Sequence, residues 1–366
     1  MPTFDLPEPH ITAEEWRRLF RAAEAFKAAM PWDWMFEELL FAVQNPETGE
    51  MGFCSITGEM REHRALITYL GEVGLGGYLT ALRGMKYASA FLEEREHGMM
   101  LLETPQLQAS FTSRQMLTAL DWQIVQEAKV RIRERKLWPF FRFFTPARLP
   151  WYINGPQARF LTLLLEQALI VAQAQQQGKI SIPPLVEVAT LPTTLPLLSR
   201  VIEDGEWVFK QQGFVPQYPA VASESQISDQ DLAALRRKLP LKNVEVQVHL
   251  AMMPLPVEEG SPPPYFPYTL LMVDAQEGIV LDASLLLPHP SLADLWTQVL
   301  PALLSDFERL GRRPERMQIA SERLYSLLAM PMGQLGIKLS RVQELPALEE
   351  AYLDLEDWTR QQHGMA

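Results

Sequence analysis

The segment from Trp138 to Tyr152 has the residue types best suited to binding a ligand. It alternates aromatic side chains with arginines and prolines. Aromatic rings stack on nucleic-acid bases, and guanidinium groups stack on rings or bind phosphates. Five residues are therefore candidate ligand-binding residues: Trp138, Arg142, Arg148, Trp151 and Tyr152. The alternative is a proline-stiffened strap whose rings fill the core, because aromatic residues dominate cores by their area alone.

Three other patterns favour structural roles. The glycine-rich run 71–77 follows no predicted strand and precedes no Lys-Ser or Lys-Thr pair, so it indicates a break between helices rather than a phosphate loop. The run 93–97 places Glu96 and His97 beside two further acids, and such a nearly continuous run of charged residues predicts a solvated helix face rather than a metal site. Cys54 lies in an apolar run, which predicts a buried, inert thiol.

The composition bounds the class of protein. A chain of 366 residues predicts two domains, because single cores stop growing near 250 to 300 residues. With 47% hydrophobic and 21% charged residues it is typical of a globular protein. A net charge of -12 opposes general attraction to nucleic acid or anionic membrane, so any such contact must be local.

No segment predicts membrane insertion or export. The first ten residues lack a basic stretch followed by an apolar one, as a signal peptide requires. The most apolar stretch, 160–172, is interrupted by Glu166 and Gln167 and is shorter than the roughly 20 residues of a membrane span. These features predict a cytoplasmic protein.

The N-terminal half predicts a mostly helical α+β domain over 1–178, with a small sheet. Thr12 begins a helix that Pro31 ends, and a turn-rich loop at 45–50 joins two strands. We expect two helices within 62–95, a strand at 106–111, a helix over 113–135 and another from Asn154 to Gln177. A proline-rich connecting region follows over 179–240, with a strand at 207–211 and a short helix at 228–237.

The C-terminal half, 241–366, predicts an α/β domain with a five-stranded mixed sheet. Apolar residues occupy every second position over 244–250, as in a half-buried strand. The remaining elements are expected in chain order as strands at 269–274 and 279–283, a helix at 291–310, a strand at 317–320, a helix at 322–335, a strand at 337–340 and a helix from Pro346.

This order of elements resembles the RNase H-like fold. The segment 271–281 is similar to the second and third strands of integrase and transposase cores, and 311–321 is similar to their approach to the fourth strand. The resemblance implies a cluster of metal-binding carboxylates on the first strand, after the fourth strand and on a later helix. Here the first strand offers Glu245 and then His249, and Ser321 follows the fourth strand. We therefore expect an RNase H-like scaffold with a degenerate site.

The whole chain also resembles bacterial two-domain proteins of unknown function. That resemblance rests on a tryptophan–proline–arginine segment, namely Trp138, Pro139, Phe141, Arg142, Pro146, Pro150 and Trp151. It implies no activity.

Two functional hypotheses follow. The first is a non-catalytic binding or scaffold protein without a cofactor, whose partner is either a protein or single-stranded nucleic acid. The second is a divergent metal-dependent nuclease that uses Asp274, Asp282 and Glu322 as its acids.

Overall fold

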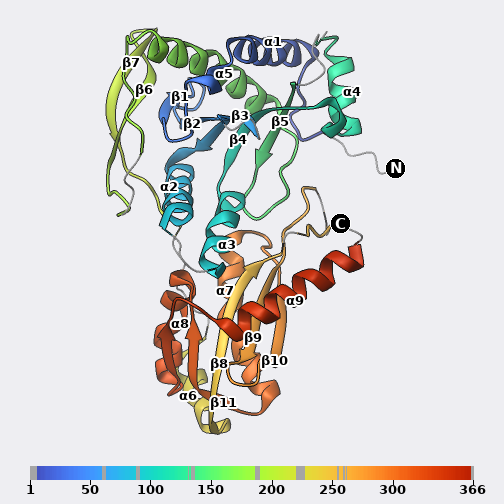
Figure 1. Ribbon diagram of the computed structural model, residues 1–366, viewed down its shortest axis with the longest axis vertical. Coiled ribbons are helices and arrows are strands. Elements are labelled where there is room, and N and C mark those ends of the chain that lie inside the picture. Colours follow the sequence, from blue (N-terminus) through green and yellow to red (C-terminus); the bar gives the residue numbers. More distant parts are fainter. Residues whose placement is uncertain are drawn as a thin grey trace. The chain divides into compact units, whose positions relative to one another are not determined.

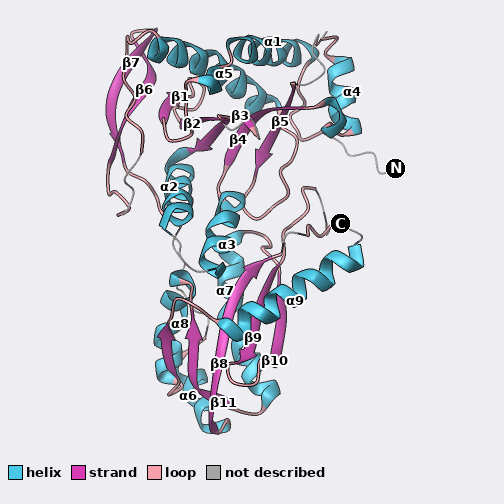
Figure 2. Ribbon diagram, in the orientation of Figure 1, coloured by secondary structure: helices cyan, strands magenta, loops and turns pink. Residues whose placement is uncertain are grey.

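The computed structural model describes residues 6–59, 63–87, 91–130, 132, 137–185, 190–219, 227–253, 255–258, 260 and 262–363. The chain divides into two compact units, each built around its own sheet (Figures 1 and 2). The N-terminal unit comprises Met1–Arg83, Thr104–Thr145 and Pro150–Tyr218. The C-terminal unit comprises Gly84–Glu103, Pro146–Leu149 and Pro219–Ala366. The protein is thus an α+β protein with two sheets.

The N-terminal unit contains a seven-stranded mixed sheet, which is larger than the small sheet predicted. Its strands run in the order β5-β4-β3-β2-β1-β6-β7, and the β1–β6 pair is parallel while the other pairs are antiparallel. The strands are β1 (Phe41–Gln44), β2 (Met51–Thr57), β3 (Arg64–Leu70), β4 (Gln106–Thr112), β5 (Trp138–Phe144), β6 (Leu195–Glu203) and β7 (Glu206–Phe214). Strands β6 and β7 lie within the predicted connecting region.

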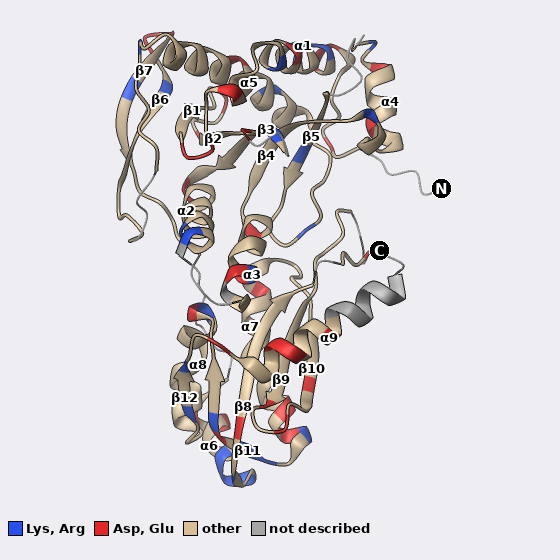
Figure 3. Cartoon of the chain, viewed as in Figure 1, with Lys and Arg blue, Asp and Glu red and all other residues tan. Residues whose placement is uncertain are grey.

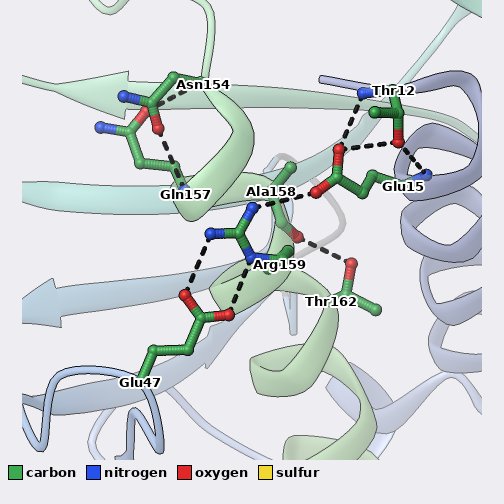
Figure 4. Close-up of polar contacts among 8 residues, drawn as sticks. All are labelled: Thr12, Glu15, Glu47, Asn154, Gln157, Ala158, Arg159 and Thr162. Atoms are coloured by element: carbon green, nitrogen blue, oxygen red, sulfur yellow. Dashed lines mark hydrogen bonds and ion pairs between the residues drawn. The ribbon is translucent and has the colours of Figure 1, made fainter. Parts of the chain in front are cut away.

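Two capped helices, α1 (Ala13–Ala29) and α5 (Gly155–Gln176), pack with this sheet around one hydrophobic core. Thr12 and Asn154 begin these helices, as the sequence predicted, and each forms a reciprocal capping box. Arg159 of α5 joins the two helix starts to the β1–β2 turn (Figure 4). Its guanidinium lies 3.0 Å from a carboxylate oxygen of Glu15 and 2.8 Å from one of Glu47.

Other elements of this unit differ from prediction. Residues 64–70 form β3 rather than the predicted helix. This strand lies between β2 and β4 and buries side chains on both faces, so its sequence lacks the alternation of apolar and polar residues that indicates a strand. The glycine run belongs to α2 (Gly71–Tyr87) and is not a break. A Cβ on Gly76 would lie 2.1 Å from the Gln217 carbonyl oxygen, so the glycine permits close backbone packing.

The predicted helix over 113–135 is also shorter than expected. A 3-10 turn, Arg114–Met116, precedes α4 (Ala119–Glu127), and Thr118 rather than Ser113 supplies the cap. Two further 3-10 turns span Pro31–Asp33 and Leu101–Glu103. Four basic residues that precede β5 in the sequence lie outside the described residues: Arg131, Arg133, Arg135 and Lys136.

The C-terminal unit confirms the predicted order of elements. Its five-stranded mixed sheet runs β10-β9-β8-β11-β12; the β8–β9 and β9–β10 pairs are antiparallel, and β11 is parallel to β8 and β12. The elements are α3 (Phe91–Met100), α6 (Asp229–Lys238), β8 (Leu241–Met252), β9 (Tyr268–Asp274), β10 (Val280–Leu286), α7 (Leu292–Leu310), β11 (Arg313–Ile319), α8 (Glu322–Gln334), β12 (Lys338–Arg341) and α9 (Pro346–His363).

Helices cover both faces of this sheet. Alternate residues of β8, such as Val248 and Leu250, pack with α7 and α8 in one core. On the opposite face Ala251 packs with α9 and with Leu92 of α3. Helix α3 therefore belongs to the C-terminal unit, although it precedes β8 by about 140 residues in the chain. None of the helices in the described part of the chain has the length and apolar character that a membrane crossing requires.

Candidate functional site

Three of the predicted aromatic and arginine residues contact one another beside β5, an edge strand of the N-terminal sheet. Arg142 forms two hydrogen bonds with Asp121, at 2.8 and 2.6 Å, and its guanidinium carbon lies 4.5 Å from the centre of the Tyr152 ring. The Tyr152 hydroxyl lies 2.8 Å from the Thr118 hydroxyl. The Trp151 ring meets the Tyr152 ring edge to face. These polar groups are occupied by contacts within the protein.

The other two predicted ligand-binding residues lie elsewhere. Trp138, at the start of β5, is buried and its ring lies 5.5 Å from that of Trp122. Arg148 belongs to the C-terminal unit, where it donates hydrogen bonds to the Pro263 carbonyl at 2.9 Å and the Tyr265 hydroxyl at 2.7 Å. The segment 138–152 therefore contributes to both units.

The three candidate acids of the nuclease hypothesis make separate contacts. Asp274 ends β9, and its carboxylate accepts the backbone N–H groups of the following turn at 2.9 and 3.0 Å. Asp282 on β10 pairs with Arg309 of α7. Glu322 begins α8 and lies 3.6 Å from Arg341. Across the described ranges, no group of three His, Cys, Asp or Glu side chains is arranged to hold a metal ion.

The C-terminal unit instead contains a small polar cavity, here called the His249 cavity. It lies where β8 nears its carboxyl end and α8 begins, and its volume is roughly 30 Å³, about twice what one water molecule requires. It is lined by residues of α3, β8, β9, α7, α8 and α9, namely Leu92, Arg95, Glu96, Met99, Glu103, His249, Leu250, Ala251, Met252, Tyr268, Trp296, Arg323 and Tyr352.

Two carboxylates from the α3 region connect to this wall by hydrogen bonds. Ser321, which caps α8, donates its hydroxyl to Glu96 at 2.9 Å. Glu103 accepts a hydrogen bond from Arg323 at 2.7 Å and another from the Tyr268 hydroxyl at 2.6 Å. The side chains of Arg323 and Glu103 are only 14% and 8% exposed. Such charge-assisted bonds away from water fix α3 against the sheet.

Three buried polar atoms of the cavity residues have no hydrogen-bond partner among the residues the structure describes. They are Nδ1 of His249, Nε1 of Trp296 and Nε of Arg323. His249 is 3% exposed and Trp296 is 5% exposed. The Arg323 guanidinium lies over the Trp296 ring at 4.3 Å from its centre. An unsatisfied buried polar group costs about 1 to 3 kcal/mol, so a molecule that meets all three groups would be stabilised here.

The local electrostatics keep His249 neutral and favour the charge on Arg323. Burial lowers the pKa of His249 to about 4. Burial also raises the pKa of Glu96, although Arg323 and the Ser321 hydroxyl act in the opposite direction. Burial disfavours the charged form of Arg323, but the carboxylates of Glu103 and Glu96 outweigh it and raise the pKa of the guanidinium. Trp296 and Arg323, which line the cavity, therefore carry buried N–H groups without a partner in the described residues, and His249 presents a neutral imidazole.

The sequence interpretation did not identify most of this site. It noted His249 and Ser321 only as replacements for acids, and the solvated face predicted for 93–97 is wrong for Glu96, whose carboxyl accepts the Ser321 hydroxyl. Tyr268, Trp296 and Arg323 follow no motif spacing. The sequence does contain the two residues of one key contact, an acid in α3 and a polar residue after the fourth strand. Because they are far apart in the chain, nothing in the sequence indicates that they meet.

Two family models match separate parts of the chain. Residues 16–187 match a domain of unknown function, DUF7309, and residues 231–356 match a second domain of unknown function, DUF6930. No curated protein and no solved structure matches the chain. The chain thus combines two domains of unknown function, DUF7309 and DUF6930.

Proposed function

We propose that this protein is a non-catalytic binding protein whose C-terminal unit is a degenerate RNase H-like domain. Three antiparallel strands followed by two parallel ones, in the order β10-β9-β8-β11-β12, support that fold. The observation that carries the function is the His249 cavity. His249 and Ser321 stand near the positions where the RNase H-like pattern places acids, and three of the residues that line the cavity carry a buried polar atom without a partner in the described residues.

The chemistry of the cavity selects a small, polar hydrogen-bond acceptor. Trp296 offers one donor and Arg323 another, and neither can accept a hydrogen bond. His249 can donate or accept at Nδ1, depending on its tautomer. Arg95 and Arg323 balance the charges of Glu96 and Glu103 around the cavity, so a compact ligand need not carry a full charge. Carboxylic acids and other small carbonyl compounds fit this description.

The indole N–H resonance of Trp296 tests the proposal directly. In the full-length protein labelled with ¹⁵N-tryptophan, Trp296→Phe assigns the signal and Trp207 of the N-terminal unit serves as the reference. Titration with acetate, formate and acetamide should shift the Trp296 signal saturably while the Trp207 signal stays constant. If none of these probes shifts the Trp296 signal, the cavity holds water alone and the binding proposal fails.

The nuclease alternative is tested in the same sample with Mn²⁺. A paramagnetic ion held by Asp274, Asp282 or Glu322 would broaden resonances near those residues, and Asp274→Ala would abolish the broadening. Because the three acids contact separate partners, we expect no saturable Mn²⁺ site there. Metal-dependent cleavage that Asp274→Ala removes would favour the nuclease instead.

A further inference from the structure

Basic residues gather at the amino ends of β8 and β11 in the C-terminal unit (Figure 3). Helix α6 ends in three consecutive basic residues, Arg236, Arg237 and Lys238. The chain then enters β8, where Lys242 pairs in register with Pro314 of β11. Arg312 and Arg313 precede that proline. These six residues, here called the basic surface, are Arg236, Arg237, Lys238, Lys242, Arg312 and Arg313.

Two of these guanidinium groups converge on the end of α8. Arg236 donates to the Gln334 carbonyl at 3.1 Å, and Arg313 donates to the Leu335 carbonyl. A Cβ placed on Gly336 would lie 3.3 Å from an Arg313 nitrogen and 3.5 Å from an Arg236 nitrogen. Burial lowers the pKa of Arg313, and the charge of Arg236 lowers it further, as expected for two cations at this separation.

No carboxylate in the described part of the chain neutralises this pair. Neither guanidinium forms an ion pair with a carboxylate in the described ranges. The end of a helix supplies only about half a negative charge against their two positive charges. The pair therefore retains a net positive charge, and an external anion would relieve the repulsion.

Most of the remaining basic surface is also unneutralised. Lys238 pairs with Glu308 at 2.7 Å. Arg237, Lys242 and Arg312 form no ion pair with any residue that the structure describes, and Arg237 and Lys242 are exposed. The protein as a whole has a net charge of -12, whereas the basic surface carries a local excess of positive charge.

We propose that the basic surface binds the phosphate backbone of a nucleic acid. Arginine and lysine side chains supply the phosphate contacts that dominate such binding. A protein partner would need an apolar or aromatic anchor. The segments 229–245 and 308–319 contain no aromatic residue, which argues against that alternative. This surface is separate from the His249 cavity and does not depend on its function.

Fluorescence polarisation with the full-length protein tests the proposal. The probes are labelled single-stranded DNA, single-stranded RNA and duplex DNA of one length, titrated between roughly 50 and 200 mM salt. Contact with about four phosphates predicts a slope of log affinity against log salt near -3.6 for duplex and near -2.8 for a single strand. The arm that binds most tightly identifies the form of the nucleic acid.

A pair of charge-matched variants decides whether this surface is responsible. Arg237→Glu/Lys242→Glu should weaken binding roughly tenfold or more and reduce the salt slope by about two. The control, Arg21→Glu/Lys179→Glu, makes the same change in net charge at exposed positions of the N-terminal unit and should leave affinity within about twofold. Both variants alter exposed side chains, and circular dichroism checks that both fold.

Three results would overturn the proposal. One is the absence of salt-dependent binding by every probe at low salt. Another is an equal loss of affinity in the control variant. The third is tighter binding of an oligoglutamate peptide of the same charge than of any nucleic acid, which would assign the basic surface to an acidic protein partner.

Discussion

Replacement of His249 by glutamine should remove an acid-sensitive component of stability. His249 is 3% exposed, and burial lowers its pKa to about 4 from an ordinary value of 6.5. In the unfolded chain the imidazole takes up a proton near pH 6.5, whereas in the folded protein it resists protonation until about pH 4. Stability is therefore retained above pH 6.5 and is lost as pH falls toward 4.

The expected magnitude follows from the two pKa values. Each pH unit between them corresponds to about 1.36 kcal/mol, so the full effect of the roughly 2.5-unit difference is about 3.4 kcal/mol. At about pH 4.5, some 2.5 kcal/mol of this should already be lost, against almost none at about pH 7.5. Other ionisable groups, including Glu96, are present in both proteins and largely cancel in the comparison.

Two measurements check this reasoning. Urea unfolding of wild type and His249→Gln at both pH values gives the difference between their pH dependences, which should be about 2.5 kcal/mol in the transition that involves the C-terminal unit. Imidazole ¹H–¹³C spectra, assigned with the same variant, should show His249 neutral throughout the native range. A His249 resonance that titrates near pH 6.5 would refute the argument, because the buried ring would then accept a proton without penalty.

Three further substitutions test packing and ion pairing, with the free energy of unfolding in urea as the measurement. Gly76→Ala should destabilise by about 1 to 3 kcal/mol through its clash with a backbone carbonyl, whereas Gly98→Ala, in an open part of α3, should stabilise by up to about 1 kcal/mol; equal effects would contradict the close approach. Arg142→Ala should cost about 3 to 5 kcal/mol, because it leaves the buried Asp121 without its cation. Combining it with Asp121→Asn should recover part of the loss, and no recovery would show that charge is not the cause. Arg323→Ala should cost a similar amount by isolating its carboxylate partner in the C-terminal unit, and a loss below about 1 kcal/mol would show that water reaches that site.

The C-terminal sheet was predictable because its signals are local. The sequence of β8 alternates over 244–250, although both faces of the strand are buried from Val246 onward rather than one face as predicted. Strands β9 and β10 are consecutive antiparallel strands joined by a turn, and α7 begins at Ser291 with a capping box and ends at Gly311 in the left-handed region. Each boundary is therefore encoded within a few residues. Helix α8 contains Pro331 near its end and still spans the predicted segment.

The N-terminal sheet was less predictable because its pairings are not local. Strand β6 pairs in parallel with β1, about 155 residues earlier in the chain, and nothing in either segment specifies that partner. Strand β5 contains Pro139, which argues against a strand except at a sheet edge, where the structure places it. The sequence of this segment therefore indicated its aromatic content but did not predict a strand.

The candidate site was hidden for the same reason. The hydrogen bonds from Arg323 to Glu103 and from Ser321 to Glu96 span 220 and 225 residues. No spacing rule connects acids in one segment to an arginine so far along the chain. The sequence could indicate that the expected acids were replaced, but only folding shows which side chains meet at His249.

The membership of α3 in the C-terminal unit has a consequence for how the two families can be separated. This helix lies within the segment that matches DUF7309, yet Leu92 and Glu96 complete the packing and polar contacts of the unit that carries DUF6930. Cutting the polypeptide between residues 187 and 231 would remove α3 from the core of the second domain. It would also leave Arg323 without the carboxylate of Glu103. A protein that contained the downstream domain alone would need another segment to take the place of α3.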